Sequence, residues 1–176
     1  QIQIDGSIGL NVHLGQFHAI EYDEWSSQIA FVAMFLADHQ ANKQMEEILG
    51  VAPNRFPLTE SAVVKQGNAL RIDWSEVCSM NENAYIMGNP PFNGNWLFTR
   101  EQREDTSELW KGVKNSGLLD YVSNWFLVSA QWAKKKNVSV GFVSTNSITQ
   151  GEQPSIIWHQ LFQLGIGIDF AFQTFD

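Results

Sequence analysis

The segment Asn89-Pro90-Pro91-Phe92 has the residue types in this sequence that are best suited to chemistry. Two consecutive prolines fix two φ angles and remove two backbone donors, so the turn that they form is stiff. A stiff turn holds the Asn89 carboxamide and the Pro90 carbonyl in fixed positions. The apolar run Tyr85-Ile86-Met87 precedes the segment and predicts a strand that ends at the turn.

Two fixed oxygen acceptors suit an acceptor substrate that carries an exocyclic amine on a planar base. The lone pair of such an amine is delocalised into the ring, and acceptors aimed at its two hydrogens would localise it. We expect the Asn89 side-chain oxygen and the Pro90 carbonyl to act in this way, by position and electrostatics, without a covalent intermediate. Phe92 is the candidate to stack on the base, a contact that contributes about 1–3 kcal/mol. The competing interpretation is an ordinary Pro-Pro turn with Phe92 in the core.

Strand and helix patterns alternate along the chain. We expect strands over residues 16–21, 62–66, 84–87, 138–143 and 167–172, and helices over 24–42, 118–136 and 154–164. This alternation, together with apolar strands, predicts an α/β domain with a largely parallel sheet that helices cover on both faces. Ligands of such sheets bind at the carboxyl ends of the strands. Polar residues end or follow three of the predicted strands: Glu21, Gly67-Asn68 and Gly88-Asn89.

The segment after the turn, residues 93–117, is polar and predicts a mobile loop with room for one helical turn. Trp96 and Trp110 lie on this segment and are candidates to line a base pocket. The second helix should bury one apolar side, formed by Leu119, Val122, Phe126, Ala130 and Ala133. The first helix should present a broad apolar face formed by Ile29, Val32, Ala33, Phe35 and Leu36.

Composition describes a globular chain with an acidic balance. The 176 residues are 44% hydrophobic and 17% charged, which suits one folded domain. The formal net charge is -8, whereas a protein that binds nucleic acid unaided is usually basic. Either the chain does not act on nucleic acid, or the basic groove lies elsewhere in a larger protein.

Several other classes of site and location are disfavoured. The lone Cys78 excludes an internal disulfide and fits a reducing, cytoplasmic compartment. No apolar run is long enough to span a membrane, so we expect no membrane partner. The four histidines and Cys78 show no metal-ligand spacing, so we predict no metal.

The run Ile86-Met87-Gly88-Asn89-Pro90-Pro91-Phe92 resembles the catalytic motif of amino-methyltransferases, in the form typical of N6-adenine DNA methyltransferases. Residues 17–24 with 37–40 resemble the second cofactor motif of large type II restriction-modification enzymes that combine cleavage and methylation in one chain. Residues 64–70 resemble the third motif, and residues 141–153 resemble the segment after the fifth strand. The resemblance covers roughly residues 16 to 172 in the order of the family.

The resemblance implies a Rossmann-like fold that uses S-adenosylmethionine. In it, Glu21 would accept hydrogen bonds from the ribose hydroxyls of the cofactor. Asn68 would contact the adenine of the cofactor, with Ala69 and Leu70 beside the ring. Glu21 could instead be a solvated acid or a helix N-terminal charge, a role that suits Asp23 or Glu24 better. Asn68 could equally be a turn residue after Gly67.

The sequence also departs from the family. The glycine-rich first motif is absent, because Gly6 and Gly9 follow no apolar strand and Gly15 does not complete the motif. We therefore expect residues 1–176 to be one partial methyltransferase domain that lacks its first strand and helix and binds cofactor weakly and without activity when alone. The gap in the sheet would be filled by residues before Phe17, by direct pairing of the Glu21 and Asn89 strands, or by a second copy of the chain.

The expected partner is duplex DNA, bound through the full-length protein with a target-recognition domain that this chain lacks. A DNA-reading surface in another part of that protein would explain the acidic balance. Asn-Pro-Pro-aromatic turns also occur in enzymes that methylate a glutamine amide in protein or a base amine in RNA. The segments after Phe92 and after Gly141 resemble the DNA enzymes, which favours DNA. An inactive structural fragment is the remaining alternative.

Overall fold

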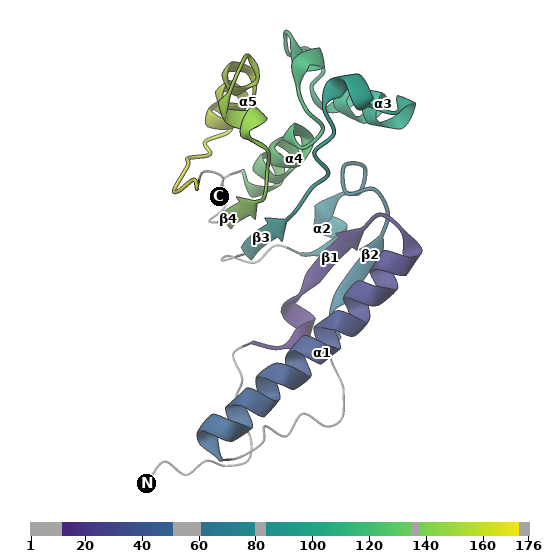
Figure 1. Ribbon diagram of the computed structural model, residues 1–176, viewed down its shortest axis with the longest axis vertical. Coiled ribbons are helices and arrows are strands. Elements are labelled where there is room, and N and C mark those ends of the chain that lie inside the picture. Colours follow the sequence, from purple (N-terminus) through teal and green to yellow (C-terminus); the bar gives the residue numbers. More distant parts are fainter. Residues whose placement is uncertain (1–11, 51–60, 80–83, 135–137, 173–176) are drawn as a thin grey trace. The chain divides into compact units, whose positions relative to one another are not determined.

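The computed structural model describes residues 12–50, 61–79, 84–134 and 138–172. The chain divides into two compact units, residues 1–79 and 80–176 (Figure 1). Gly6 and Gly9 lie outside the described residues, and Gly15 lies in a short 3-10 turn, η1 (Leu14–Gln16). No described helix combines the length and apolarity that crossing a membrane requires.

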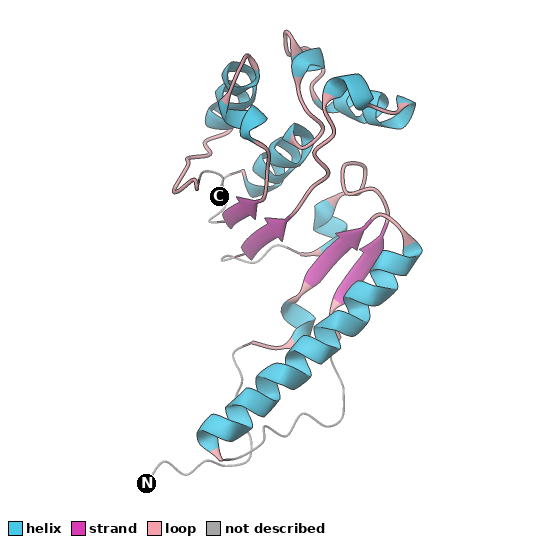
Figure 2. Cartoon of the chain, viewed as in Figure 1, coloured by secondary structure: helices cyan, strands magenta, loops and turns pink. Residues whose placement is uncertain are grey.

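The first unit is a strand-helix-strand arrangement. Its elements are β1 (His18–Glu21), α1 (Glu24–Leu49), β2 (Val63–Gln66) and the short α2 (Trp74–Val77). The two strands are parallel, with His18 opposite Val63 and Glu21 opposite Gln66. The long helix α1 lies along this strand pair (Figure 2). Both predicted strands and their parallel direction are confirmed.

Side-chain and backbone caps set the two ends of α1. Asp23 accepts hydrogen bonds from the Ser26 backbone N–H and from the Ser26 hydroxyl, both at 2.8 Å. Gly50 ends the helix in the left-handed region, with φ of 70°, and its N–H donates to the Glu46 carbonyl at 2.8 Å. Glycine adopts this conformation without the steric cost of a Cβ. The helix therefore continues beyond residue 42, where the sequence predicted its end, and runs to Leu49.

The predicted apolar face of α1 is not buried among the described residues. Ile29, Val32 and Leu36 are all exposed, as is Trp25 one turn earlier. No residue of α1 is buried. Of the residues predicted for this face, only Phe35 is half-buried, so most of the face lies open among the described residues.

The cap at Asp23 predicts a pH dependence of unit 1. Hydrogen bonds from the Ser26 N–H, and then from the Ser26 hydroxyl, hold the pKa of the Asp23 carboxyl below its ordinary value. A group with a lowered folded pKa stabilises the fold above its unfolded pKa, and this stabilisation is lost as the pH falls through the folded pKa. Helicity should thus fall more steeply in acid for the native chain than for Asp23→Asn, which still caps the helix but does not titrate. Acid titrations followed by circular dichroism that coincide for the two proteins would refute this.

The described part of the second unit contains a parallel strand pair and three α-helices. Its elements are β3 (Ala84–Gly88), α3 (Arg100–Leu109), α4 (Ser123–Ala133), β4 (Val138–Phe142) and α5 (Gln153–Gln163), with 3-10 turns η2 (Asn95–Leu97), η3 (Ser116–Leu118) and η4 (Asn146–Thr149). β3 and β4 are parallel, with Ala84 opposite Val138 and Gly88 opposite Phe142. The α/β class with parallel strands is confirmed in both units.

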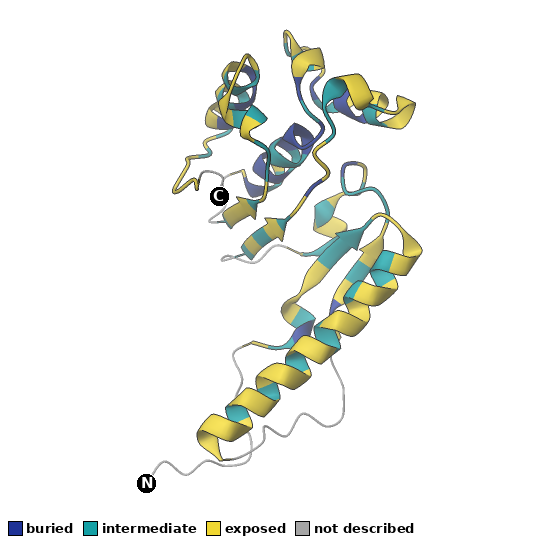
Figure 3. Cartoon of the chain, in the orientation of Figure 1, coloured by how far each residue is buried: buried dark blue, intermediate teal, exposed yellow. Residues whose placement is uncertain are grey.

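Buried side chains of α4, of α5 and of the segment between α3 and α4 form the core of the second unit. The core cluster consists of Trp110, Leu119, Leu127, Ala130, Ile156, Ile157 and Leu161. Phe126 of α4 contacts Phe142 of β4 edge to face at 5.3 Å between ring centroids. The apolar side predicted for the second helix is therefore the side that packs, and Figure 3 shows the buried stretch along α4.

Three details of the prediction are wrong. Residues 93–117 contain the ten-residue helix α3 rather than one helical turn. The helix predicted over 118–136 begins later, at Ser123, after the η3 turn. Residues 167–172 form no strand, because no described strand pairs with them and an unpaired extended segment leaves its backbone groups without a ladder.

Candidate functional site

Glu21 is the last residue of β1 and lies at the carboxyl end of the first strand pair. The Gly67 N–H donates to the Glu21 carbonyl at 2.8 Å, which carries the ladder to the point where both strands end. The Glu21 side chain makes no hydrogen bond or ion pair with another described residue. Asp23 supplies the N-terminal cap of α1, so that role does not occupy Glu21. The Glu21 carboxylate is therefore available at the strand end.

The turn after β2 is fixed by its own polar groups. The Asn68 side-chain oxygen accepts from the Leu70 N–H at 2.9 Å, and the Trp74 indole N–H donates to the Ala69 carbonyl at 2.8 Å. Gly67 has φ of 147°, and a Cβ there would lie 2.6 Å from Ile72 Cδ1. Both facts favour glycine at this position.

The local hydrogen bond gives Asn68 the turn role that sequence reasoning had left as an alternative. Ala69 is half-buried and Leu70 is buried, so the Leu70 side chain packs inside the unit. Glu21 and Asn68 share one end of the parallel pair, as predicted. Contacts of Asn68, Ala69 and Leu70 with a cofactor stay a prediction.

The Asn89-Pro90-Pro91-Phe92 turn follows β3 directly. The Val143 N–H donates to the Gly88 carbonyl at 3.0 Å, so the ladder reaches the residue before Asn89. A Cβ on Gly88 would lie 3.2 Å from Phe142 Cε1, which shows how closely this ring packs at the base of the turn. Pro90 is buried, whereas Asn89 and Pro91 are exposed.

The exposure of the side chains in this turn bears on one part of the competing interpretation, the placement of Phe92 in the core. Phe92 is 39% exposed, so it is not a core residue. The Asn89 side chain makes no hydrogen bond within the described part of the chain. A buried Pro90 between an exposed amide and an exposed ring is an arrangement that can present both groups to a ligand. β3 belongs to the second unit, so a strand edge shared by Asn89, Glu21 and Asn68 stays a prediction.

A sequence profile of the DNA-methyltransferase domain of MmeI matches residues 1–176. The chain belongs to the MmeI DNA-methyltransferase domain family. It is 39% identical over 168 residues to DNA methyltransferase A of Bacillus subtilis (strain 168), an alignment that covers 94% of this chain and 19% of that protein.

A solved structure of the type IIL restriction-modification enzyme MmeI in complex with DNA is also similar. The TM-score is 0.78 at 38% sequence identity, and the match covers 88% of this chain and 21% of that one. The chain thus spans about a fifth of the length of these relatives. The family resemblance and the methyltransferase fold predicted from the sequence are both confirmed.

The two tryptophans that were candidates to line a base pocket in this MmeI-type domain differ in their exposure. Trp110 is 1% exposed, and its indole N–H donates to the Asn124 side-chain oxygen at 2.8 Å. It is a core residue, so its assignment to a base pocket is wrong. Trp96 is 78% exposed and lies four residues after Phe92.

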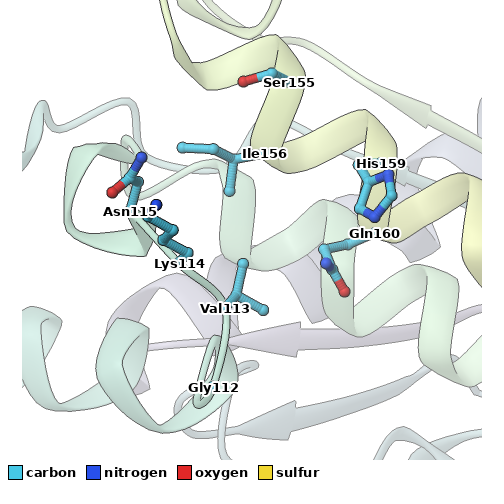
Figure 4. A pocket seen from close by; sticks show the side chains of 8 residues that line it. All are labelled: Gly112, Val113, Lys114, Asn115, Ser155, Ile156, His159 and Gln160. Atoms are coloured by element: carbon cyan, nitrogen blue, oxygen red, sulfur yellow. The ribbon is translucent and has the colours of Figure 1, made fainter.

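A depression of about 370 Å³ lies in the second unit and contains none of the predicted site residues (Figure 4). It lies between the loop Gly112–Asn115 and one side of α5, where it is lined by Ser155, Ile156, His159 and Gln160. Within the ranges that the structure describes, no three histidine, cysteine or acidic side chains gather closely enough to hold a metal.

Sequence reasoning missed a buried polar network between α3 and α4 of the MmeI-type domain. Its hydrogen bonds run from the Tyr121 hydroxyl to Asp105 at 2.7 Å and from the Asn124 side-chain amide to the Thr106 hydroxyl at 2.9 Å. All four residues are at most 5% exposed. Only the capping pattern Thr99-x-x-Gln102 gave a signal in the sequence, and that signal concerns where α3 begins.

Proposed function

We propose that this domain transfers a methyl group from S-adenosylmethionine to the N6 amine of an adenine in duplex DNA. The observation that carries the proposal is the Asn89-Pro90-Pro91-Phe92 turn, which ends β3 with Asn89 and Phe92 exposed around a buried Pro90. The relatives support DNA as the acceptor, since one is called a DNA methyltransferase and the other was solved in complex with DNA. Both units would contribute to one catalytic domain, and the intact protein would act in a restriction-modification system.

In this proposal Asn89 and Pro90 prepare the amine for attack. The Asn89 side-chain oxygen and the Pro90 carbonyl accept hydrogen bonds from the two amine hydrogens, which directs the nitrogen lone pair toward the methyl donor. The buried Pro90 ring and the ladder bond at Gly88 hold these oxygens in place before the substrate arrives. Fixed acceptors need no reorganisation during the reaction, which is the main source of catalysis of this kind.

Phe92 would hold the target base. An adenine inside a duplex cannot reach the turn, so it must leave the stack and be bound in a pocket. The exposed Phe92 ring offers a face for stacking, and Pro91 stiffens its connection to Asn89. A stacked base loses the freedom to rotate away from the two acceptors.

The first unit would bind the cofactor, which supplies an electrophilic methyl group on a sulfonium. Glu21 fits the ribose, because its carboxylate stands at a strand end without a described partner and can accept from two hydroxyls. The fixed turn Asn68–Leu70, on the same end of the pair, would flank the adenine ring of the cofactor.

Removing the Glu21 carboxylate should weaken cofactor binding. Hydrogen bonds to a charged group contribute about 1.5–3 kcal/mol, so Glu21→Ala in the intact protein should raise the Kd for S-adenosylmethionine about 10- to 100-fold. Glu24→Ala removes an exposed acid three residues later and should leave the Kd nearly unchanged. Calorimetric titration of both variants checks this, and equal affinities for Glu21→Ala and the native protein would contradict it.

The nature of the methyl acceptor is tested separately. Turns of this type could also serve a glutamine amide in protein or a base amine in RNA, because both are planar. The intact protein should transfer labelled methyl groups to duplex DNA and not to RNA or protein. Labelling confined to RNA or protein would reject DNA as the substrate while leaving the role of the turn intact.

A further inference from the structure

Asn93 anchors the segment that leaves the Asn-Pro-Pro-Phe turn. Its carbonyl accepts from the Tyr121 backbone N–H at 2.8 Å. Its side-chain amide lies 3.4 Å from the Gln102 side-chain oxygen, which also accepts from the Thr99 N–H at 3.0 Å. The residue after Phe92 is thus tied to α3 and to the segment that leads into α4.

Tyr121 is itself held tightly. It is 5% exposed, and its hydroxyl donates to Asp105 Oδ2 at 2.7 Å. Its ring makes edge-to-face contacts with Phe98 at 5.5 Å and Trp125 at 5.1 Å between centroids. Hydrogen bonds to a buried carboxylate are stronger than those between neutral groups, so the Asp105 contact fixes the position of Tyr121.

We propose that Tyr121, held by Asp105, is a positioning residue that sets the direction of Phe92 through the Asn93 carbonyl. Phe92 lies between two fixed points, the buried Pro90 and the Asn93 anchor. With both points fixed, the exposed ring keeps one orientation although no core packing holds it. This inference rests on the proposed function of the turn. A misplacement of about 1 Å in such a site can cost about 100-fold in rate.

The same helix interface offers a matched control. Thr106 follows Asp105 on α3, and its hydroxyl accepts from the Asn124 side-chain amide at 2.9 Å. Neither of these two hydrogen-bonding residues is bonded to Asn93 through the Thr106 hydroxyl. The Thr106 hydroxyl also donates to the Gln102 backbone carbonyl at 2.9 Å. Thr106→Val therefore removes one hydrogen bond between α3 and α4 and one within α3, while the Tyr121 hydroxyl and the bond from the Tyr121 N–H to the Asn93 carbonyl stay in place.

The test compares Tyr121→Phe with Thr106→Val in the intact protein. Tyr121→Phe keeps the aromatic ring and removes the hydroxyl. It should lower kcat about tenfold or more, leave the Kd for S-adenosylmethionine unchanged, and speed hydrogen exchange of the backbone amide at position 121. Thr106→Val should lower the melting temperature about as much as Tyr121→Phe does. Its kcat and the exchange rate of the amide at position 121 should stay close to the native values. Equal kcat values for the two variants, or native exchange at position 121 in Tyr121→Phe, would overturn the proposal.

A second pair of variants addresses the carboxylate. Asp105→Asn keeps an oxygen that can accept from the Tyr121 hydroxyl and should retain most of kcat, whereas Asp105→Leu should match Tyr121→Phe. Equal losses in both Asp105 variants would contradict a role through that hydrogen bond. If the intact native protein does not methylate DNA, the proposed function fails, and the exchange measurement still decides whether Tyr121 holds the Asn93 anchor.

Discussion

Asn89→Ala in the intact protein is expected to lower the rate of methyl transfer by several orders of magnitude, with the affinity for S-adenosylmethionine nearly unchanged. The Asn89 side chain is exposed at the end of β3 and has no hydrogen-bond partner among the described residues, so its removal leaves the fold intact. What is lost is an acceptor that contributes only while the amine becomes a nucleophile. Loss of such an interaction lowers kcat and not cofactor binding.

A second asparagine serves as the control for this experiment. Asn95 donates from its side chain to the Gly117 carbonyl at 2.7 Å and is not placed at the acceptor site, so Asn95→Ala should keep most of the rate. Single-turnover kinetics with saturating cofactor compare the two variants. If Asn89→Ala kept more than about a tenth of the native rate, a loss below ~1.4 kcal/mol, Asn89 would not be the principal catalytic residue.

Trp110→Ala should destabilise the second unit by about 3–5 kcal/mol, because a fully buried tryptophan leaves a large cavity when truncated. Trp110 is 1% exposed within the core cluster, and the variant also removes the indole N–H that donates to the buried Asn124 side-chain oxygen. Hydrogen exchange in α4 and α5 reports this loss within the intact protein. The protection factors of their slowest amides should fall by a factor of about 100 or more.

Trp96→Ala is the matched variant for stability. Its side chain is 78% exposed, so the change should alter protection in α4 and α5 by no more than about 0.5 kcal/mol. Similar protection in Trp110→Ala and Trp96→Ala would show that the core of the second unit does not depend on Trp110.

The strands and turns were predictable because their signals are local. Alternation of apolar strands and helices, the polar residues at the strand ends and the stiff Pro90-Pro91 pair all act over a few residues. The same locality explains the errors. Residues 167–172 are apolar enough for a strand, but a strand requires a partner that the residues themselves do not specify. The end of α1 could have been placed at Gly50, since the residues before it are good helix formers.

The sequence predicted which residues form the candidate site, but not the contacts that hold them in place. Asn89 and Phe92 stand out because they flank two prolines, and the structure leaves both exposed. The tie between Asn93 and Tyr121 joins residues far apart in the sequence through a backbone hydrogen bond, which leaves no pattern of residue types. Asp105 and Trp110 lie in a segment that reads as polar and mobile, and only tertiary packing turns them into buried residues.

The identity of the methylated atom tests the central claim most directly. The intact protein is incubated with duplex DNA and S-adenosylmethionine that carries a labelled methyl group, and the DNA is then digested to nucleosides and analysed by mass spectrometry. We predict that the label appears in N6-methyladenine and is lost with Asn89→Ala. Label in a cytosine product, or DNA that stays unlabelled while RNA or protein is methylated, would contradict the account.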